Sequence, residues 1–131
     1  PLRITKKHIP TEQIAVCVLS QQQRWLIHRR PAKGLLASMW EFPNVVGSGE
    51  TGRTALQQLL ASVGLRVDID PAPTGTIKHV FSHKIWQMTL YKGRLTDGTL
   101  QTKEDWQWLP KQAYTSVPWA GPHGKITAMA E

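Results

Sequence analysis

Three adjacent residues, Phe81, Ser82 and His83, combine side chains that proteins use to recognise nucleic acids. A phenylalanine ring can stack on a base, and a serine hydroxyl can donate or accept a hydrogen bond. An imidazole can reach a phosphate and is attracted more strongly when it is protonated. Further candidate phosphate contacts flank the tripeptide: Lys78, His79 and Lys84. By itself the tripeptide is better explained as a core phenylalanine, a turn serine and a surface histidine, so only its context can support a functional interpretation.

Positive charge is concentrated at the start of the chain. The 131 residues carry 16 Lys and Arg against 9 Asp and Glu, a formal net charge of +7. Residues 1–34 hold seven of the basic residues and one acidic residue, so most of the excess lies there. Such a segment favours a polyanion such as nucleic acid, although a solvated basic face gives the same pattern. Arg29 and Arg30 are the candidate phosphate contacts within it.

The composition predicts one folded domain without a metal centre. A chain of this length with 40% hydrophobic residues fits a single domain with its own core. The one cysteine, Cys17, excludes an internal disulfide framework and a cysteine-based zinc or iron–sulfur cage, and its apolar neighbours indicate an inert core thiol. His8, His28 and His123 have no partner at metal-ligand spacing. No apolar run approaches the roughly 20 residues that cross a bilayer, and no signal peptide is expected.

Residues 1–12 have the composition of a connector. They are polar and contain two prolines and a lysine pair. The chain begins with Pro1 rather than methionine, so we expect a piece of a longer protein, in which 1–12 is the connector and 13–131 the folded domain.

Hydrophobic periodicity predicts an α+β fold with a mixed sheet. Strands are expected over 14–19, 24–29, 65–69, 76–80, 84–94 and 105–109, with a shorter extended segment around 45–46. The spacing of Leu56, Leu59, Leu60 and Val63 indicates the apolar face of one internal helix. Its expected N-cap is Thr51 and its expected C′ residue is Gly64. We also expect turns at 21–23 and 97–98 and a short helix within 123–131.

A string from residue 41 to residue 65 resembles the signature of the Nudix family, the fold of the MutT nucleotide hydrolases. Glu41-Phe42-Pro43 precedes a glycine-rich turn, Gly49-Glu50-Thr51 matches the start of the family's helix, and Val63-Gly64-Leu65 matches its end. In that family, glutamates on the helix bind a divalent metal that activates water. Residues 51–65 contain no carboxylate, and Glu50 alone cannot build such a site. The resemblance therefore implies a scaffold that binds rather than cuts, with Glu41 and Glu50 in structural roles and no catalytic residue.

Three further strings resemble the C-terminal domain of bacterial adenine DNA glycosylases, the MutY family. They are residues 25–31 (WLIHRRP), residues 34–43 (GLLASMWEFP) and residues 78–84 (KHVFSHK). The resemblance extends from about residue 11 to residue 128, and the middle string is the most specific. It implies a MutT-like domain that recognises 8-oxoguanine opposite adenine through Phe81, Ser82 and His83.

The same resemblance implies the partners. They are duplex DNA containing an 8-oxoguanine·adenine pair and the catalytic domain of the parent glycosylase, with no membrane, in a monomer of the bacterial cytoplasm associated with the nucleoid. The catalytic aspartate and a four-iron cluster belong to the catalytic domain in that family. This chain is therefore expected to carry neither a cofactor nor a catalytic residue.

Two other functions remain open at this stage. A divergent Nudix hydrolase of oxidised nucleotides would need carboxylates that the helix lacks. A protein-interaction module of a repair protein would use exposed tryptophans. Large aromatic residues dominate small cores, however, so most of the six tryptophans are expected to be core or hydrophobic surface.

Overall fold

The computed structural model describes residues 9–102 and 104–130. The strands are β1 (Thr11–Gln21), β2 (Arg24–Arg29), β3 (Trp40–Glu41), β4 (Asn44–Val46), β5 (Leu65–Ile69), β6 (Gly75–Val80), β7 (Ile85–Gly98) and β8 (Trp106–Pro110). The helices are α1 (Gly49–Ala61), the 3-10 helix η1 (Lys111–Ser116) and α2 (His123–Met129). Within these residues, no helix has the length and hydropathy needed to cross a bilayer.

A mixed sheet organises the molecule around β1. This strand runs parallel to β7 over 11–19 and antiparallel to β4, and it turns into β2 through Gln22 and Gln23. Both glutamines have positive φ, which is the geometry that a two-residue hairpin loop with the twist of its strands requires. Strand β7 also pairs with β6 and β5, and β2 pairs with β3 and β8. The combination of parallel and antiparallel pairs confirms the α+β fold with a mixed sheet.

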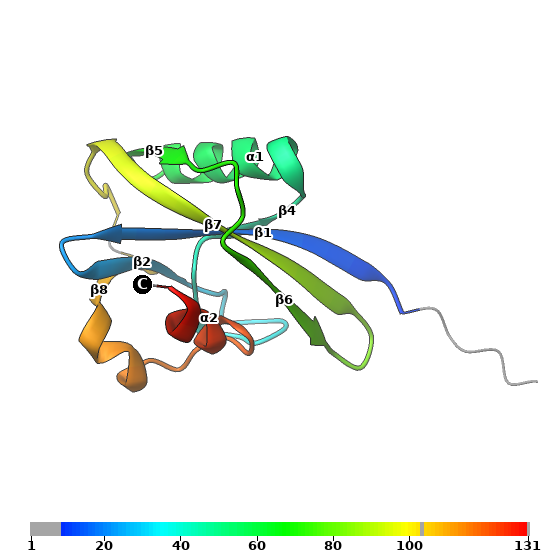
Figure 1. The fold of residues 1–131 in the computed structure, drawn as a ribbon. Helices are drawn as coiled ribbons and strands as arrows, with labels where there is room; N and C mark the ends of the chain where they lie inside the picture. Colours follow the sequence, from blue (N-terminus) through cyan, green and yellow to red (C-terminus); the bar gives the residue numbers. More distant parts are fainter. Residues whose placement is uncertain (1–8, 103, 131) are drawn as a thin grey trace, which may run out of the picture.

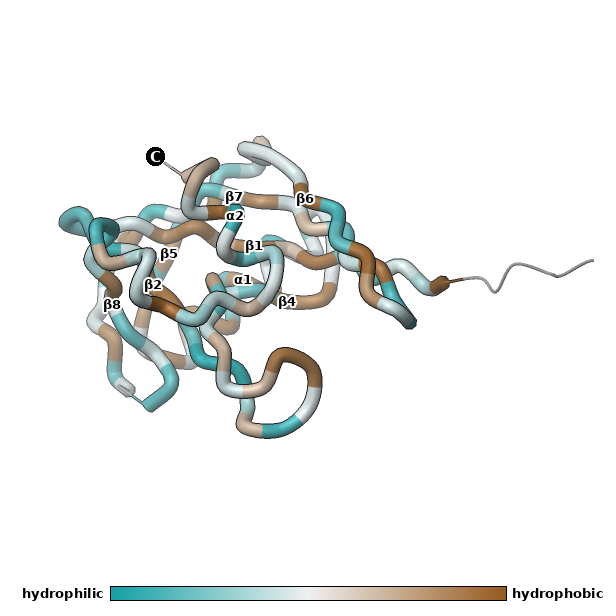
Figure 2. The backbone as a smooth tube through the Cα atoms, turned by 90° about the horizontal axis from the view of Figure 1, so that it is seen from below, coloured by the Kyte–Doolittle hydropathy of each residue, from teal (hydrophilic) through white to brown (hydrophobic). Residues whose placement is uncertain are grey.

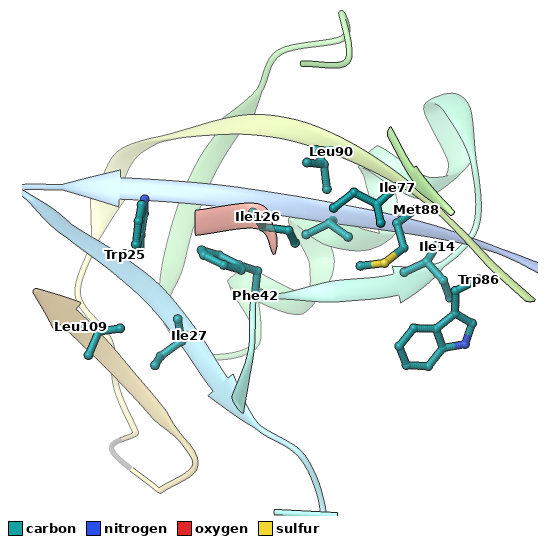
Figure 3. Packing of buried hydrophobic residues seen from close by; sticks show 11 residues of the cluster. Ile14, Trp25, Ile27, Phe42, Ile77, Trp86, Met88, Leu90, Leu109 and Ile126 are labelled. Carbon is teal, nitrogen blue, oxygen red and sulfur yellow. The ribbon is translucent and has the colours of Figure 1, made fainter. Parts of the chain in front are cut away.

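Two hydrophobic clusters lie on opposite faces of β1. Successive side chains of a strand point to opposite faces, so Ile14 and Val16 enter one cluster while Ala15 and Cys17 enter the other. Helix α1 covers the second cluster and α2 lies over the first, as the ribbon shows (Figure 1). Figure 3 shows the first cluster, in which side chains from β1, β2, β6, β7, β8 and α2 converge. Burial on both faces explains the continuous apolar run 14–19.

The predicted core aromatics and the core thiol are confirmed. Trp25, Trp86 and Trp106 are buried. The other tryptophans, Trp40, Trp108 and Trp119, are half-buried and pack against the two clusters. Cys17 is fully buried, and burial raises the pKa of its thiol to about 12. The thiol therefore stays protonated and unreactive at neutral pH.

Several predicted boundaries were wrong. Helix α1 has Ser48, not Thr51, as its N-cap, because the amide of Gly52 already bonds to the Ser48 carbonyl. Strand β7 continues through the expected turn at 97–98, since Leu65 of β5 pairs with Gly98. Gly64 does adopt the positive φ expected after a helix.

The connector boundary needs a similar adjustment. Strand β1 begins at Thr11, so residues 11 and 12 are part of the sheet rather than of a connector. Residues 1–8 lie outside the described residues.

Side chains from the two strands that flank β7 pack closely over Gly93. A Cβ atom there would lie 2.6 Å from the Cys17 sulfur and 3.1 Å from a methyl carbon of Val67. We expect Gly93→Ala to lower the free energy of unfolding by about 1–3 kcal/mol through overpacking, measured by urea denaturation. Adding Cys17→Ala removes the nearest atom and should recover part of that loss. Strictly additive costs in the double variant would contradict this packing.

Candidate functional site

The Phe81–His83 tripeptide forms the tip of the β6–β7 hairpin. The amide of Phe81 donates to the carbonyl of Lys84 at 2.7 Å, which closes a four-residue turn beyond the last strand pair, Val80 and Ile85. Ser82 and His83, the central residues of this turn, are exposed. Figure 1 shows the hairpin projecting from the body, and Figure 2 shows its hydrophilic tip directly after an apolar stretch. The turn is therefore available to a partner molecule.

Three aromatic rings support the turn from behind. The Phe81 ring lies edge-on to Trp86, with centroids 4.8 Å apart, and edge-on to His79 at 4.5 Å. Trp86 is buried, whereas Phe81 and His79 are half-buried. We call His79, Phe81 and Trp86 the aromatic brace. It anchors Phe81 against the first hydrophobic cluster, so the position of Ser82 depends on packed rings rather than on a free loop.

A carboxylate from β1 ties the brace to the turn. Trp86 Nε1 donates to Glu12 Oε1 at 3.1 Å, and Lys84 Nζ lies 3.5 Å from the same oxygen. Glu12 and Trp86 are register partners in the parallel β1–β7 pair. The amide of Ile85 also donates to the carbonyl of Pro10. The start of β1 and the start of β7 are thus joined directly beneath the turn.

An arginine continues this network into the loop after β2. The Arg30 guanidinium lies over the Trp86 ring, 5.6 Å from its centroid, and Nη1 donates to Glu41 Oε1 at 2.9 Å. The other oxygen of Glu41 lies 3.0 Å from His28 Nδ1. Burial alone would raise the pKa of the Glu41 carboxyl, but hydrogen bonds from His28, Asn44 and Arg30, together with the electrostatic effect of His123, outweigh burial and hold that pKa below its ordinary value. Glu41 therefore has the structural role that was predicted for it, as a buried ionised partner of Arg30.

His123 supports the backbone directly after Glu41. Its ring is almost fully buried at the start of α2, and its Nδ1 accepts a hydrogen bond from the amide of Phe42 at 3.1 Å. The pKa of His123 is lowered to about 4, chiefly by burial, while the charge of Glu41 opposes this shift and that of Arg30 adds to it. A neutral ring is also what the hydrogen bond requires, because a protonated Nδ1 cannot accept from an amide.

The structure gathers some predicted phosphate contacts and separates others. Arg30 lies over Trp86 of the brace, Lys84 pairs with Glu12 beside it, and His79 belongs to the brace. Lys78 is exposed on the opposite face of β6 from His79, since the strand alternates. Arg29 pairs with Asp105, whose Oδ1 lies 2.8 Å from Nη2, and lies over the Trp40 ring. Arg29 and Lys78 are therefore not part of the network beneath the turn.

Sequence reasoning missed the contributions of Glu12 and Trp86 to this site. Glu12 was assigned to the connector, and Trp86 was treated only as core. Their contact joins residues 74 positions apart, so no local pattern announces it. A strand start at residue 11 would have been the one available signal, because it places Glu12 on the sheet face that also carries Ile14.

Helix α1 lacks the carboxylates of a metal-dependent hydrolase. Glu50, in its first turn, is the only acidic residue between Gly49 and Ala61. Its neighbours on the outer face of the helix are the polar or small residues Thr51, Thr54, Ala55 and Gln58. Across residues 9–102 and 104–130, no group of three or more histidine, cysteine, aspartate or glutamate side chains is arranged to hold a metal ion.

Comparison with known families agrees with this architecture. The sequence model of the NUDIX domain matches residues 15–129. The chain belongs to the Nudix family. Solved structures with the same fold include the solution structure of the E. coli ORF135 protein, with a TM-score of 0.70, 17% identity, and coverage of 92% of this chain and 89% of that one.

This Nudix domain is also similar to adenine DNA glycosylases. The Homo sapiens enzyme is 36% identical over 90 residues and the Rattus norvegicus enzyme 34% over 91, in each case 63% of this chain. The matched region spans only 16% and 18% of those proteins. The C-terminal domain of mouse MUTYH, solved in complex with human PCNA, has the same fold, with a TM-score of 0.68, 23% identity, and coverage of 90% of this chain and 86% of that one.

The buried His123 predicts a pH-dependent stability of this Nudix domain. Its pKa is about 4 when folded against an ordinary value near 6.5, so only the unfolded chain takes up this proton between those pH values. The free energy of unfolding should therefore fall as pH drops from 6.5 toward 4, with a slope approaching about 1.4 kcal/mol per pH unit. The lowered pKa of Glu41 adds a further loss only below its ordinary pKa of 4.5. Urea denaturation between pH 7 and about 4.5 isolates the histidine.

A matched pair of variants assigns this slope. His123→Gln keeps an acceptor for the Phe42 amide but cannot titrate, so it should flatten the dependence in this window. His83→Gln changes an exposed histidine on the turn and serves as the control. A slope that disappears equally in both variants, or that persists in His123→Gln, would contradict the assignment to His123.

Proposed function

We propose that this Nudix domain is the lesion-reading part of an adenine DNA glycosylase and that it recognises 8-oxoguanine opposite adenine in duplex DNA. The observation that carries the proposal is the exposed Ser82–His83 tip, held on an aromatic brace, in a chain 34–36% identical to adenine DNA glycosylases over 63% of its length. On this proposal, base excision and its cofactors belong to a catalytic domain outside this chain.

The chemistry of the lesion suits a hydroxyl at the tip. 8-Oxoguanine differs from guanine by a carbonyl at C8 and by a proton on N7, which makes N7 a donor instead of an acceptor. The Ser82 hydroxyl can accept from N7–H, and with normal guanine it would have to rotate and donate instead. Discrimination by this one contact is about 1–2 kcal/mol, roughly fivefold to thirtyfold in affinity.

Phe81 serves this reading as an anchor. Its ring already packs against Trp86 and His79, so insertion between bases would cost those contacts. The exposed apolar residue next to the tip is Val80, with 59% of its surface accessible. His83 and Lys84 supply the contacts to phosphate, which position the duplex without reading its sequence.

Two rival functions have specific tests. Because α1 carries a single carboxylate, we expect the purified chain to release no phosphate or pyrophosphate from 8-oxo-dGTP in the presence of magnesium. Sustained turnover, lost in Glu50→Gln, would overturn the proposal in favour of a hydrolase. A protein-interaction role is favoured by one neighbour, the mouse MUTYH domain solved with PCNA. Complete absence of salt-sensitive DNA binding would support that role instead.

Binding to matched duplexes tests the proposal directly. We expect amide resonances of Ser82 and His83 to shift when the ¹⁵N-labelled chain is titrated with an 8-oxoguanine·adenine duplex, and the affinity to exceed that for guanine·adenine. Ser82→Ala should reduce this preference by roughly fivefold or more, because it removes the only acceptor proposed for N7–H. His83→Ala should lower the affinity for both duplexes by the same factor, and this factor should grow as the salt concentration falls.

Ser62→Ala is the matched control. Ser62 is an exposed serine at the end of α1, and its hydroxyl donates to the Leu59 carbonyl within the helix. This variant should retain the wild-type preference. An unchanged preference in the Ser82→Ala/His83→Ala double variant would refute the assignment of lesion reading to the turn.

A further inference from the structure

We propose that Glu12 is a positioning residue for lesion recognition and that it couples the start of β1 to the tip of the β6–β7 hairpin. The inference rests on the proposed function, because it names how the reading turn is held. Glu12 does not touch the tip residues Ser82 and His83 in any contact that the structure shows. Its action passes through Trp86 and Lys84.

Three side chains align across three neighbouring strands. Glu12 of β1 is the register partner of Trp86 of β7, and Trp86 is the register partner of His79 of β6. Register partners point to the same face of a sheet, so the three form one row directly behind the turn. Phe81 closes against two members of this row.

One hydrogen bond fixes the orientation of the Trp86 indole. Trp86 is 6% exposed, and its only polar atom donates to Glu12 Oε1 at 3.1 Å. A ring of this size has few rotamers in a packed site, and the hydrogen bond selects the one that places its edge toward the carboxylate. Without an acceptor, the N–H would favour an orientation in which another polar partner or water reaches it. The faces that Phe81 and Arg30 contact would then turn with the ring.

Lys84 links Glu12 to the turn itself. Lys84 closes the turn by its carbonyl, which accepts from Phe81, while its ammonium lies 3.5 Å from Glu12 Oε1. This pair is well exposed, with 40% and 38% of the two side chains accessible, so its contribution is small beside the hydrogen bond. The indole contact is therefore the main connection, and the lysine pair is secondary.

Glu12 lies at the very start of β1. It is the second residue of β1, and the carbonyl of Pro10 just before the strand bonds to Ile85. Any displacement of residues 10–12 therefore moves an acceptor of Trp86 and the first residue of β7 together. Through this connection, the path of the chain ahead of β1 can influence the geometry of the lesion-reading tip.

Three substitutions separate positioning from simple stability. Glu12→Gln keeps an oxygen that can accept from Trp86 but removes the charge facing Lys84, Glu12→Leu removes both interactions, and Trp86→Phe keeps an aromatic ring without the N–H. The control is Glu50→Leu, which makes the same change at the exposed acidic residue of α1. Each variant is titrated with the 8-oxoguanine·adenine and guanine·adenine duplexes, and the free protein is compared by ¹H–¹⁵N spectra.

The expected result is a selective loss of lesion preference. In Glu12→Leu and Trp86→Phe the ratio of the two affinities should fall roughly threefold to tenfold, about the value of one hydrogen bond, with displaced Ser82 and His83 amide resonances before DNA is added. Glu12→Gln should retain the wild-type ratio and resonances, as should Glu50→Leu. A structural role alone would lower the midpoint of unfolding in Glu12→Leu and leave the ratio and the tip resonances unchanged.

The two proposals fail differently. If the wild-type chain shows no preference for the oxidised duplex, the proposed function fails, and the tip resonances of the free variants still decide whether Glu12 positions the turn. If the wild type prefers the oxidised duplex and Glu12→Leu keeps both that preference and the wild-type tip resonances, the positioning role of Glu12 is wrong.

Discussion

The parallel pairing of β1 with β7 is the constraint on which the rest of the structure depends. Nine residues of β1, from Thr11 to Leu19, pair in unbroken register with nine of β7. The pairing places β1 inside the sheet, so its side chains alternate between two separate clusters. At one end it brings Gly93 against the Cys17 sulfur, and at the other it sets Glu12 beside Trp86. Core packing and the candidate site are consequences of one register.

This register also explains how a Nudix scaffold can present a binding site away from its helix. In the metal-dependent members of the family, the chemistry belongs to carboxylates on the helix. Here Glu50 is the only acidic residue of α1. The polar and aromatic residues that could recognise a partner are gathered instead at the tip of the β6–β7 hairpin, which projects from the body of the molecule (Figure 1). Family membership therefore fixes the scaffold but not the function.

Much of the fold could be predicted from local patterns, whereas the site could be predicted only in part. The apolar run 14–19 predicts a strand, and the spacing of Leu56, Leu59 and Leu60 predicts a helix. Both predictions need only the pattern of apolar residues that become buried, and the sequence contains that pattern. The N-cap of α1 was misplaced, because Ser48 and Thr51 are both favourable N-cap residue types and only the backbone bond from the Gly52 amide to the Ser48 carbonyl distinguishes them. Successive side chains of a strand point to opposite faces, and this alternation along β6 would have separated Lys78 from His79, which were grouped together as candidate phosphate contacts. The contact between Glu12 and Trp86 depends on the strand register, which no single segment contains.

Folding pairs part of the positive charge of the first quarter of the chain with acidic residues from other segments. Arg29 and Arg30 both belong to the basic first quarter, but Asp105 neutralises one and Glu41 the other. Arg30 also covers Trp86, so its guanidinium is committed to holding the brace. Ion-paired arginines release few counterions from DNA, because their charge is already compensated. If the domain reads DNA as proposed, most of the non-specific attraction must therefore come from residues outside this network. Ser82, an uncharged side chain held on the aromatic brace, would then contribute chiefly to distinguishing one base from another.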